Sequence, residues 1–207
     1  MSNVETRRGR PVDRQARAER RAQILDAAHQ CFSRKGFHAT TTAEISAEAQ
    51  ISVAGLYQYF PSKDDLIQEL IEQDLTDSIA LVEAIMAGND FFDSAESILL
   101  QAMQDERQAA MARIRLEILA EASRSPRIAA ILASSDQRFT AAMVRAITLA
   151  QTKGQVAADV DPFELAVALT CLADGLFGRL CLPPYARGPF VTASVQMIRR
   201  AAAPTKP

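Results

Sequence analysis

Side chains that can hydrogen-bond to phosphates or to base edges are concentrated between residues 41 and 63. Thr41, Thr42 and Ser52 stand at the starts of short predicted helices, where free backbone N–H groups favour anions. Gln58 carries an amide that can pair bidentately with N6 and N7 of adenine. Lys63 adds a positive charge at the end of the segment. These residue types indicate contact with a nucleic acid.

The charge of the chain is unevenly distributed. Residues 1–35 contain nine Lys or Arg against four Asp or Glu, a local charge of +5, whereas the whole chain of 207 residues carries −2. The remainder therefore sums to −7. A basic head on an acidic body suggests that one end meets a polyanion. A solvated charged tail would have the same composition.

Short helices must position the polar segment. A Thr41–Glu44 capping box predicts a helix over 42–49, and Ser52 can cap another over 53–59. The break of three residues between them has the spacing of a helix-turn-helix. An apolar face before them predicts a helix over 16–35, which Gly36 ends; its residues are Ile24, Leu25, Ala28, Cys31 and Phe32.

The rest of the chain also has helical periodicity and few breakers, with 8 Gly and 9 Pro in all. The Asp93–Glu96 pair is expected to open one helix, and Ser125–Pro126 and Asp161–Pro162 two others. We therefore predict an all-α protein of about nine helices. Its expected parts are a basic arm (1–15), a three-helix domain (16–62) and a larger helical domain (63–203), and the further helices are placed at 62–86, 94–104, 106–123, 126–154, 161–182 and 190–202.

Residues 17–70 resemble the DNA-binding domain of the TetR family of transcriptional regulators. The resemblance rests on Gly36-Phe37, Ala39-Thr40-Thr41, Ile45, Ile51-Ser52, Leu56-Tyr57, Tyr59-Phe60 and Ser62-Lys63-Asp64-Asp65-Leu66. It implies that residues 16–62 are a DNA-binding domain and that residues 63–203 bind an effector and form a dimer. It also implies that the second helix of the motif enters a major groove and that Tyr57 and Lys63 contact phosphates. The residues expected at DNA are Thr41, Thr42, Ser52, Val53, Ala54, Gly55, Tyr57, Gln58, Tyr59 and Lys63, with Arg8 and Arg10 of the arm.

Three positions depart from the family pattern. Gln50 replaces the turn glycine, so a residue with a side chain must adopt the turn conformation. Val53 shares a helix face with Leu56 and Phe60, and is either a groove contact or part of the core. Gly55 weakens its helix but permits close approach to DNA.

The arm contains Arg8-Gly9-Arg10-Pro11, which is similar to the core of an AT-hook that lies in an A·T minor groove. Unspecific attraction to phosphates is the alternative.

A stripe of small residues in the 161–182 helix suits the two-fold dimer that the resemblance implies, although close packing within one chain would use the same pattern. The stripe is Val167, Cys171, Gly175 and Gly178. Asp174 lies among apolar neighbours, so we expect it at a dimer edge or in solvent, or paired with Arg179 or a ligand. A mainly apolar or aromatic effector is predicted from side chains that would otherwise form ordinary core, and the candidates are Met103, Met111, Phe139, Met143, Asp174 and Phe177.

No nucleophile, phosphate-binding or metal motif is present, so we expect neither an enzyme nor a cofactor or metal site. Glu117 and Glu121 are interpreted as a solvated, salt-bridged face. Three scattered cysteines, Cys31, Cys171 and Cys181, are expected to be reduced core residues. No apolar run suits a membrane or a signal peptide, so a cytoplasmic protein is expected.

The sequence thus predicts a homodimeric repressor that binds an operator in double-stranded DNA and is released by a small molecule. The alternative is a helical protein of the same fold that acts through, or is controlled by, a protein partner.

Overall fold

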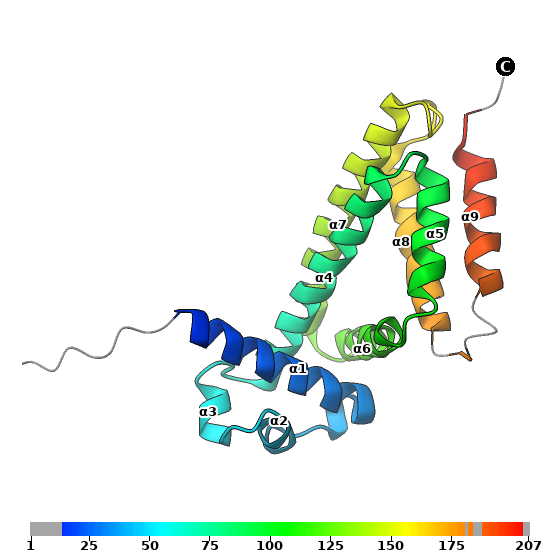
Figure 1. The fold of residues 1–207 in the computed structure, drawn as a ribbon. Helices are drawn as coiled ribbons and strands as arrows, with labels where there is room; N and C mark the ends of the chain where they lie inside the picture. Colours follow the sequence, from blue (N-terminus) through cyan, green and yellow to red (C-terminus); the bar gives the residue numbers. More distant parts are fainter. Residues whose placement is uncertain (1–13, 181, 184–187, 205–207) are drawn as a thin grey trace, which may run out of the picture.

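The computed structural model describes residues 14–180, 182–183 and 188–204, apart from the side chain of Arg107, and these residues form nine α-helices and no strand (Figure 1). The prediction of an all-helical fold is confirmed. The helices are α1 (Arg14–Ala39), α2 (Thr42–Glu48), α3 (Val53–Tyr57), α4 (Lys63–Ala87), α5 (Phe91–Ala102), α6 (Glu106–Ala122), α7 (Pro126–Thr152), α8 (Pro162–Arg179) and α9 (Gly188–Ala202).

Helices α1 to α3 form a head at one end of the molecule, and α4 leads from it into the body (Figure 1). The predicted caps are present in the head: Thr41 and Glu44 form a complete capping box on α2. Ser52 accepts from the N–H of Gly55 at the start of α3, and Ser62 accepts from the N–H of Asp65 at the start of α4. Each bond satisfies an N–H that the helix itself leaves free.

The end of α1 is bent at a glycine. Gly36 has φ 75° and ψ 171°, outside helical values, so the predicted C′ glycine is confirmed, and a further turn continues to Ala39. The apolar face of α1 is buried as predicted, with Ile24 and Ala28 fully inaccessible.

Several predicted helix boundaries were wrong. Helix α5 begins at Phe91, not after Asp93, because Asp90 accepts from the N–H groups of Phe92 and Asp93. Both phenylalanines, Phe91 and Phe92, are buried, which draws this turn into the core. The motif helix α3 ends at Tyr57, and α8 ends at Arg179.

Two apolar cores hold the protein together. The first joins α1 to α3 with the beginning of α4 and with Ile114, Ile118 and Ile128 of α6 and α7. The second lies among α4 to α9. The domain division after residue 62 stays a prediction, and the first core contains residues on both sides of it.

Among the described residues, no helix combines the length and the apolar character needed to cross a membrane. Cys31 is buried as expected, whereas Cys171 is exposed, and Cys181 lies outside the described residues.

Candidate DNA-recognition surface and effector cavity

One side of helix α3 is exposed to solvent and carries both polar and apolar side chains. Ser52, Ala54 and Gln58 are exposed, while Leu56 and Phe60 are 0% and 1% exposed. Val53 is 39% exposed, so in this structure it is not core. Its contact with DNA stays a prediction, as do the contacts of Ser52, Ala54 and Gln58.

Tyr57 lies beside α2 at the same surface. Its hydroxyl is 3.3 Å from the hydroxyl of Thr42, and the side chain is 47% exposed. Tyr59 is half-buried, with its ring below the guanidinium of Arg17 and its carbonyl accepting from Arg21 at 3.2 Å. Tyr59 also packs against the first core, and its predicted base contact stays a prediction.

Lys63 has partners that the sequence did not suggest. Its Nζ donates to the carbonyl of Phe37 in the last turn of α1 at 2.5 Å and to that of Thr40, directly after α1, at 3.2 Å. The ammonium has three N–H groups, so one remains for a phosphate. The predicted phosphate contact is untested, and Lys63 also stabilises the fold of the head.

The turn between α2 and α3 contains a residue in the left-handed region. Gln50 has φ 53°, so a residue with a side chain adopts the turn conformation that glycine usually provides, as predicted. Gly55 faces the cap, because a Cβ there would lie 3.2 Å from the hydroxyl of Ser52. The cap therefore leaves little room for a side chain at Gly55.

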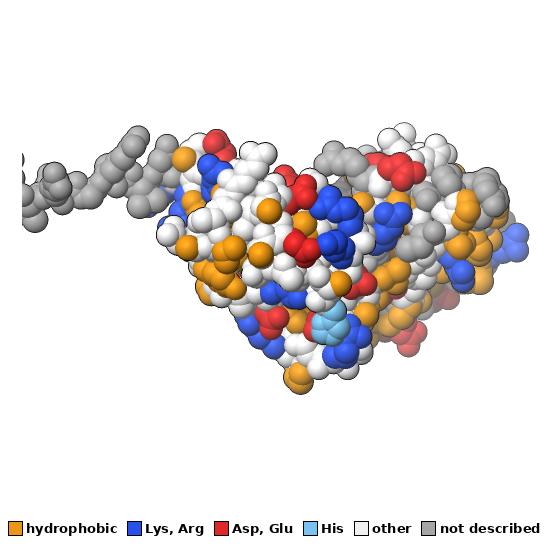
Figure 2. All heavy atoms as spheres, turned by 90° about the horizontal axis from the view of Figure 1, so that it is seen from below, with side chains coloured by type: hydrophobic (Ala, Val, Ile, Leu, Met, Phe, Trp, Pro, Cys, Tyr) orange, Lys and Arg blue, Asp and Glu red, His pale blue; other side chains and the backbone are white. Residues whose placement is uncertain are grey.

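The positive charge of the head is largely balanced by acids in the fold. Residues 1–70 contain ten Lys or Arg and nine Asp or Glu, a net charge of +1. Arg21 pairs with Glu69, Arg34 with Glu48 at 2.6 Å, and Lys35 with Glu44 at 2.5 Å. Figure 2 shows basic and acidic side chains interspersed on this end of the molecule.

Apart from Lys63, the basic groups of residues 1–70 outside these pairs are at the beginning of the chain. Arg14, Arg17 and Arg20 lie on the first turns of α1, and Arg20 bonds only to Gln23 in the described part of the chain. Arg8 and Arg10 lie outside the described residues. Attraction to DNA is therefore expected to come mostly from α1 and the arm.

The body contains an apolar chamber of about 110 Å³ that joins a wider mouth of about 320 Å³. Ser78, Leu81, Arg115 and Phe177 line both. The chamber lies between α4, α5, α7, α8 and α9, and its aromatic lining consists of Phe91, Phe92, Phe139 and Phe177. Such a concave, mainly apolar site with a few polar groups is typical of small-molecule binding.

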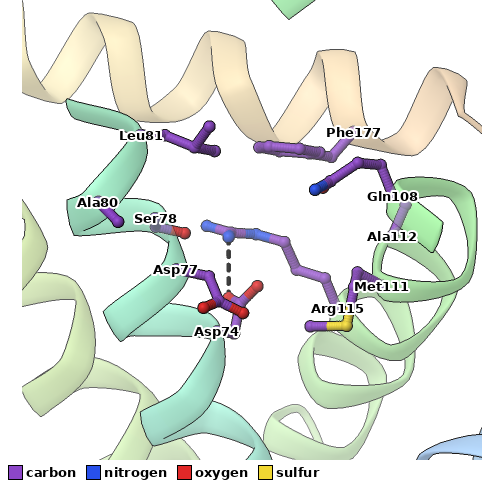
Figure 3. Close-up of a pocket in the computed structure, with 10 residues that line it drawn as sticks. All are labelled: Asp74, Asp77, Ser78, Ala80, Leu81, Gln108, Met111, Ala112, Arg115 and Phe177. Carbon is purple, nitrogen blue, oxygen red and sulfur yellow. Dashed lines mark hydrogen bonds and ion pairs between the residues drawn. The ribbon is translucent and has the colours of Figure 1, made fainter. Parts of the chain in front are cut away.

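An ion triad centred on Arg115 lies beside these two spaces. Arg115 of α6 donates to Asp74 of α4 at 2.9 Å and to Asp174 of α8 at 3.0 Å. Figure 3 shows the Arg115 side chain reaching across the mouth, with the ring of Phe177 on one side and Asp74 and Asp77 on the other. The guanidinium carbon lies 5.4 Å from the centre of that ring.

Burial and nearby charges change the pKa values of carboxyl groups in and beside the triad. Burial raises the pKa of Asp74, and the charge of Arg115 opposes that rise. Burial, followed by the charge of Asp174, raises the pKa of Asp136. Asp136 and Asp174 line a small space of about 30 Å³ beside the triad. The carboxylates here are thus held in a partly dehydrated, electronegative environment.

Five of the six predicted effector residues border these spaces: Met111 the mouth, Phe139 and Met143 the chamber, Phe177 both, and Asp174 the small space. Met103 is 3% exposed in the second core and lines none of them, because it caps the end of α5 inside the body. The partner of Asp174 is Arg115 and not Arg179, which lies over Phe190 at 5.0 Å.

Sequence reasoning did not find Arg115 or Asp74, because the two are 41 residues apart and no local spacing joins them. The one signal was the wholly apolar neighbourhood of Asp174, which required a partner.

Helix α6 joins the cavity to the head. Met111 contacts His29 of α1, with 2.9 Å between the sulfur and Nε2. Glu117 accepts from the N–H of Phe37 at 2.9 Å, next to the bend at Gly36. Glu121 pairs with Arg124, as expected for a salt-bridged face. The same interpretation was wrong for Glu117, which bonds to the backbone of α1 instead.

The small-residue stripe of α8 is open in the single chain. Val167 is 41% exposed and Cys171 is exposed. A Cβ added at Gly175 or Gly178 would meet nothing within 4 Å. The close packing within one chain that the pattern also allowed is absent at both glycines, and the dimer contact stays a prediction.

Comparison with known proteins gives matches over most of the chain. The profile of bacterial regulatory proteins of the tetR family matches residues 24–70, and that of the BetI-type transcriptional repressor C-terminal domain matches residues 93–203. The HTH-type transcriptional regulator UidR of Escherichia coli K12 is 34% identical over 142 residues, which cover 68% of this chain and 71% of UidR. TtgR of Pseudomonas putida is 28% identical over 177 residues, or 80% and 82% of the two chains. The structure of Salmonella enterica GusR superimposes with a TM-score of 0.77 at 28% identity and covers 87% of this chain and 93% of GusR.

Proposed function

The chain belongs to the TetR family of bacterial transcriptional regulators, and from this premise we propose that it is a homodimeric repressor that leaves its operator when a small molecule fills the body. The family and its named members are transcriptional regulators, not enzymes. We place its action in the cytoplasm, where the operator would lie.

The observation that supports this proposal most strongly is the presence of two separate sites. Helix α3 is exposed at the first core, and the aromatic chamber lies in the second. Gln58 projects from α3 with its amide unused by the described residues, so it is the proposed reader of an adenine. The chamber between α4 and α8 is the proposed effector site.

Contacts through α6 support communication between the two. Met111 borders the mouth and contacts His29, and Glu117 holds the bend of α1. An effector that favours another position of α6 would change the placement of the heads, and by linkage would weaken DNA binding as much as DNA weakens effector binding.

The experiment is a selection of bound fragments from random DNA by the purified protein, followed by a screen for small molecules that release them. Gln58→Ala should weaken binding by about 1 to 3 kcal/mol and relax the preference at a single base pair. Gln73→Ala, on an exposed position of α4, is the matched control and should bind like wild type. A purified protein without any sequence preference would contradict the proposal and favour the alternative of action through a protein partner.

A further inference from the structure

The effector cavity has more negative than positive charge. Four carboxylates line its three spaces, those of Asp74, Asp77, Asp136 and Asp174, and Arg115 is the one basic residue among the described lining residues. Arg115 pairs with Asp74 and Asp174. Within the described part of the chain, Asp77 and Asp136 make no ion pair or hydrogen bond.

The surroundings of Arg115 indicate the kind of group that this part of the cavity can accommodate. Its guanidinium is bonded to two carboxylates and lies over the ring of Phe177 at 5.4 Å. Carboxylates and an aromatic face are together the surroundings that stabilise an organic cation. Beside this pair of anions, Asp77 lines the mouth and Asp136 lines the small space, and both residues are exposed.

The chamber next to the triad suits the rest of such a molecule. Its lining combines the rings of Phe91, Phe92 and Phe139 with aliphatic side chains, and Arg115 is its one charged member. A ligand that extends from mouth to chamber would place one end against carboxylates and the other against aromatic rings.

We propose that the effector is an organic cation with an aromatic or branched apolar group, held with its charge at the mouth near Asp77 and its apolar part in the chamber. This inference rests on the proposed function, because it names the chemical class of the effector that the repressor would sense. An anion is disfavoured because Arg115 already carries two carboxylates, so a third negative group would meet uncompensated Asp77 and Asp136.

The test uses three probes. Trimethylphenylammonium and tert-butylbenzene have the same shape, because a carbon replaces the charged nitrogen in the second, and benzoate is the anionic probe. Binding to the full-length protein is followed by NMR titration at two salt concentrations. The variants are Asp77→Asn and Asp136→Asn, whose side chains have no described partner to lose. Asp159→Asn removes the same charge from an exposed position that lines none of the three spaces and is the control.

Each cavity variant should raise the Kd of the cation by about two- to fivefold, as expected for a partly exposed charge pair, and leave the Kd of the neutral probe unchanged. Added salt should weaken the binding of the cation and leave the binding of the neutral probe unchanged. Asp159→Asn should change neither Kd. A cation that does not bind at millimolar concentration, or that responds to the variants in the same way as the neutral probe, would overturn the proposal. Tighter binding of benzoate than of the cation would do the same.

DNA measurements keep this inference apart from the proposed function. Release of a selected operator by the neutral probe or by benzoate, but not by the cation, overturns the cation proposal and leaves the ligand-released repressor intact. A protein that binds the cation with the expected charge dependence, but binds no DNA in its absence, supports the cation site and contradicts the repressor.

Discussion

Gln50 holds a backbone conformation that suits glycine. Its φ of 53° lies in the left-handed region, which costs a residue with a Cβ about 1 kcal/mol or more. Gln50→Gly should therefore increase the free energy of unfolding by up to about 1 kcal/mol, measured by denaturant titration. The exposed side chain has no bond in the described structure that the change would remove.

The same substitution at Gln58 is the control. Gln58 has φ −69° and ψ −23°, ordinary helical values, so Gln58→Gly should lower stability by up to about 1 kcal/mol. Two changes of equal sign would contradict the explanation by backbone conformation.

Glu44 provides a stability contribution that depends on pH. The hydrogen bond from Lys35, then those from Thr41, lower the pKa of Glu44 from 4.5 to about 2. Because the folded pKa lies below the unfolded one, the contribution is fully present above about pH 4.5 and is lost as the pH falls toward 2. Glu44→Gln should thus be less stable than wild type at pH 7, and the difference should vanish near pH 2 in denaturant titrations at several pH values. A difference that is constant with pH would refute the assignment.

At the level of single residues, the sequence was sufficient where the cause is local. The Thr41–Glu44 box and the strained turn at Gln50 follow from neighbours within three residues. Lys63 and Arg115 could not be placed, because their partners Phe37 and Asp74 are 26 and 41 residues away. Only the packing of α1 against α4, and of α6 against α4, brings those atoms together.

Helix α6 is anchored to the bend of α1 by one side chain. Glu117 accepts from the N–H of Phe37, and a Cβ on Gly36 would lie 2.8 Å from the same carboxylate oxygen. Glu117→Ala should cost about 1 to 3 kcal/mol of stability, because it leaves a partly buried N–H without its acceptor. Gly36→Ala should cost a similar amount, through its φ of 75° and the displacement of Glu117.

The double variant tests whether these effects are coupled. With Glu117 already removed, the added methyl of Gly36→Ala meets no carboxylate. The double variant should therefore lose less stability than the sum of the losses of the two single variants. Denaturant titration of the four proteins gives the coupling energy. Glu121→Ala, one turn further along α6 and paired only with Arg124 in the described residues, should cost a few tenths of a kcal/mol. Additive losses at Gly36 and Glu117 would show that the two residues act separately.

At the level of helices, the sequence was sufficient to predict that each helix exists, but not where some of them begin and end. Capping pairs such as Asp161–Pro162 located α8 because the cap and the first turn are adjacent in the chain. The start of α5 was misplaced because Asp90 and Asp93 both offer a carboxylate at that point, and the burial of Phe91 decides between them. Burial depends on α9, which packs beside α5 but follows it by some 90 residues.

For the whole molecule, the proposed dimer determines how strongly DNA binding depends on salt. If each head neutralises about three phosphates, a dimer covers roughly six, and the logarithm of affinity should fall with that of salt at a slope of about −5.

The space around Gly178 is open in the single chain, so Gly178→Leu should fold normally yet clash with its copy across a two-fold axis. Sedimentation should then show a shift toward monomer, and the salt slope should fall to about half, because a monomer brings one head to the DNA. Ala84→Leu, at an exposed position of α4, adds the same bulk and should keep both the dimer and the slope. If Gly178→Leu retains the dimer constant, α8 does not form the interface; if it becomes monomeric with an unchanged slope, one head alone carries the electrostatic contact with DNA.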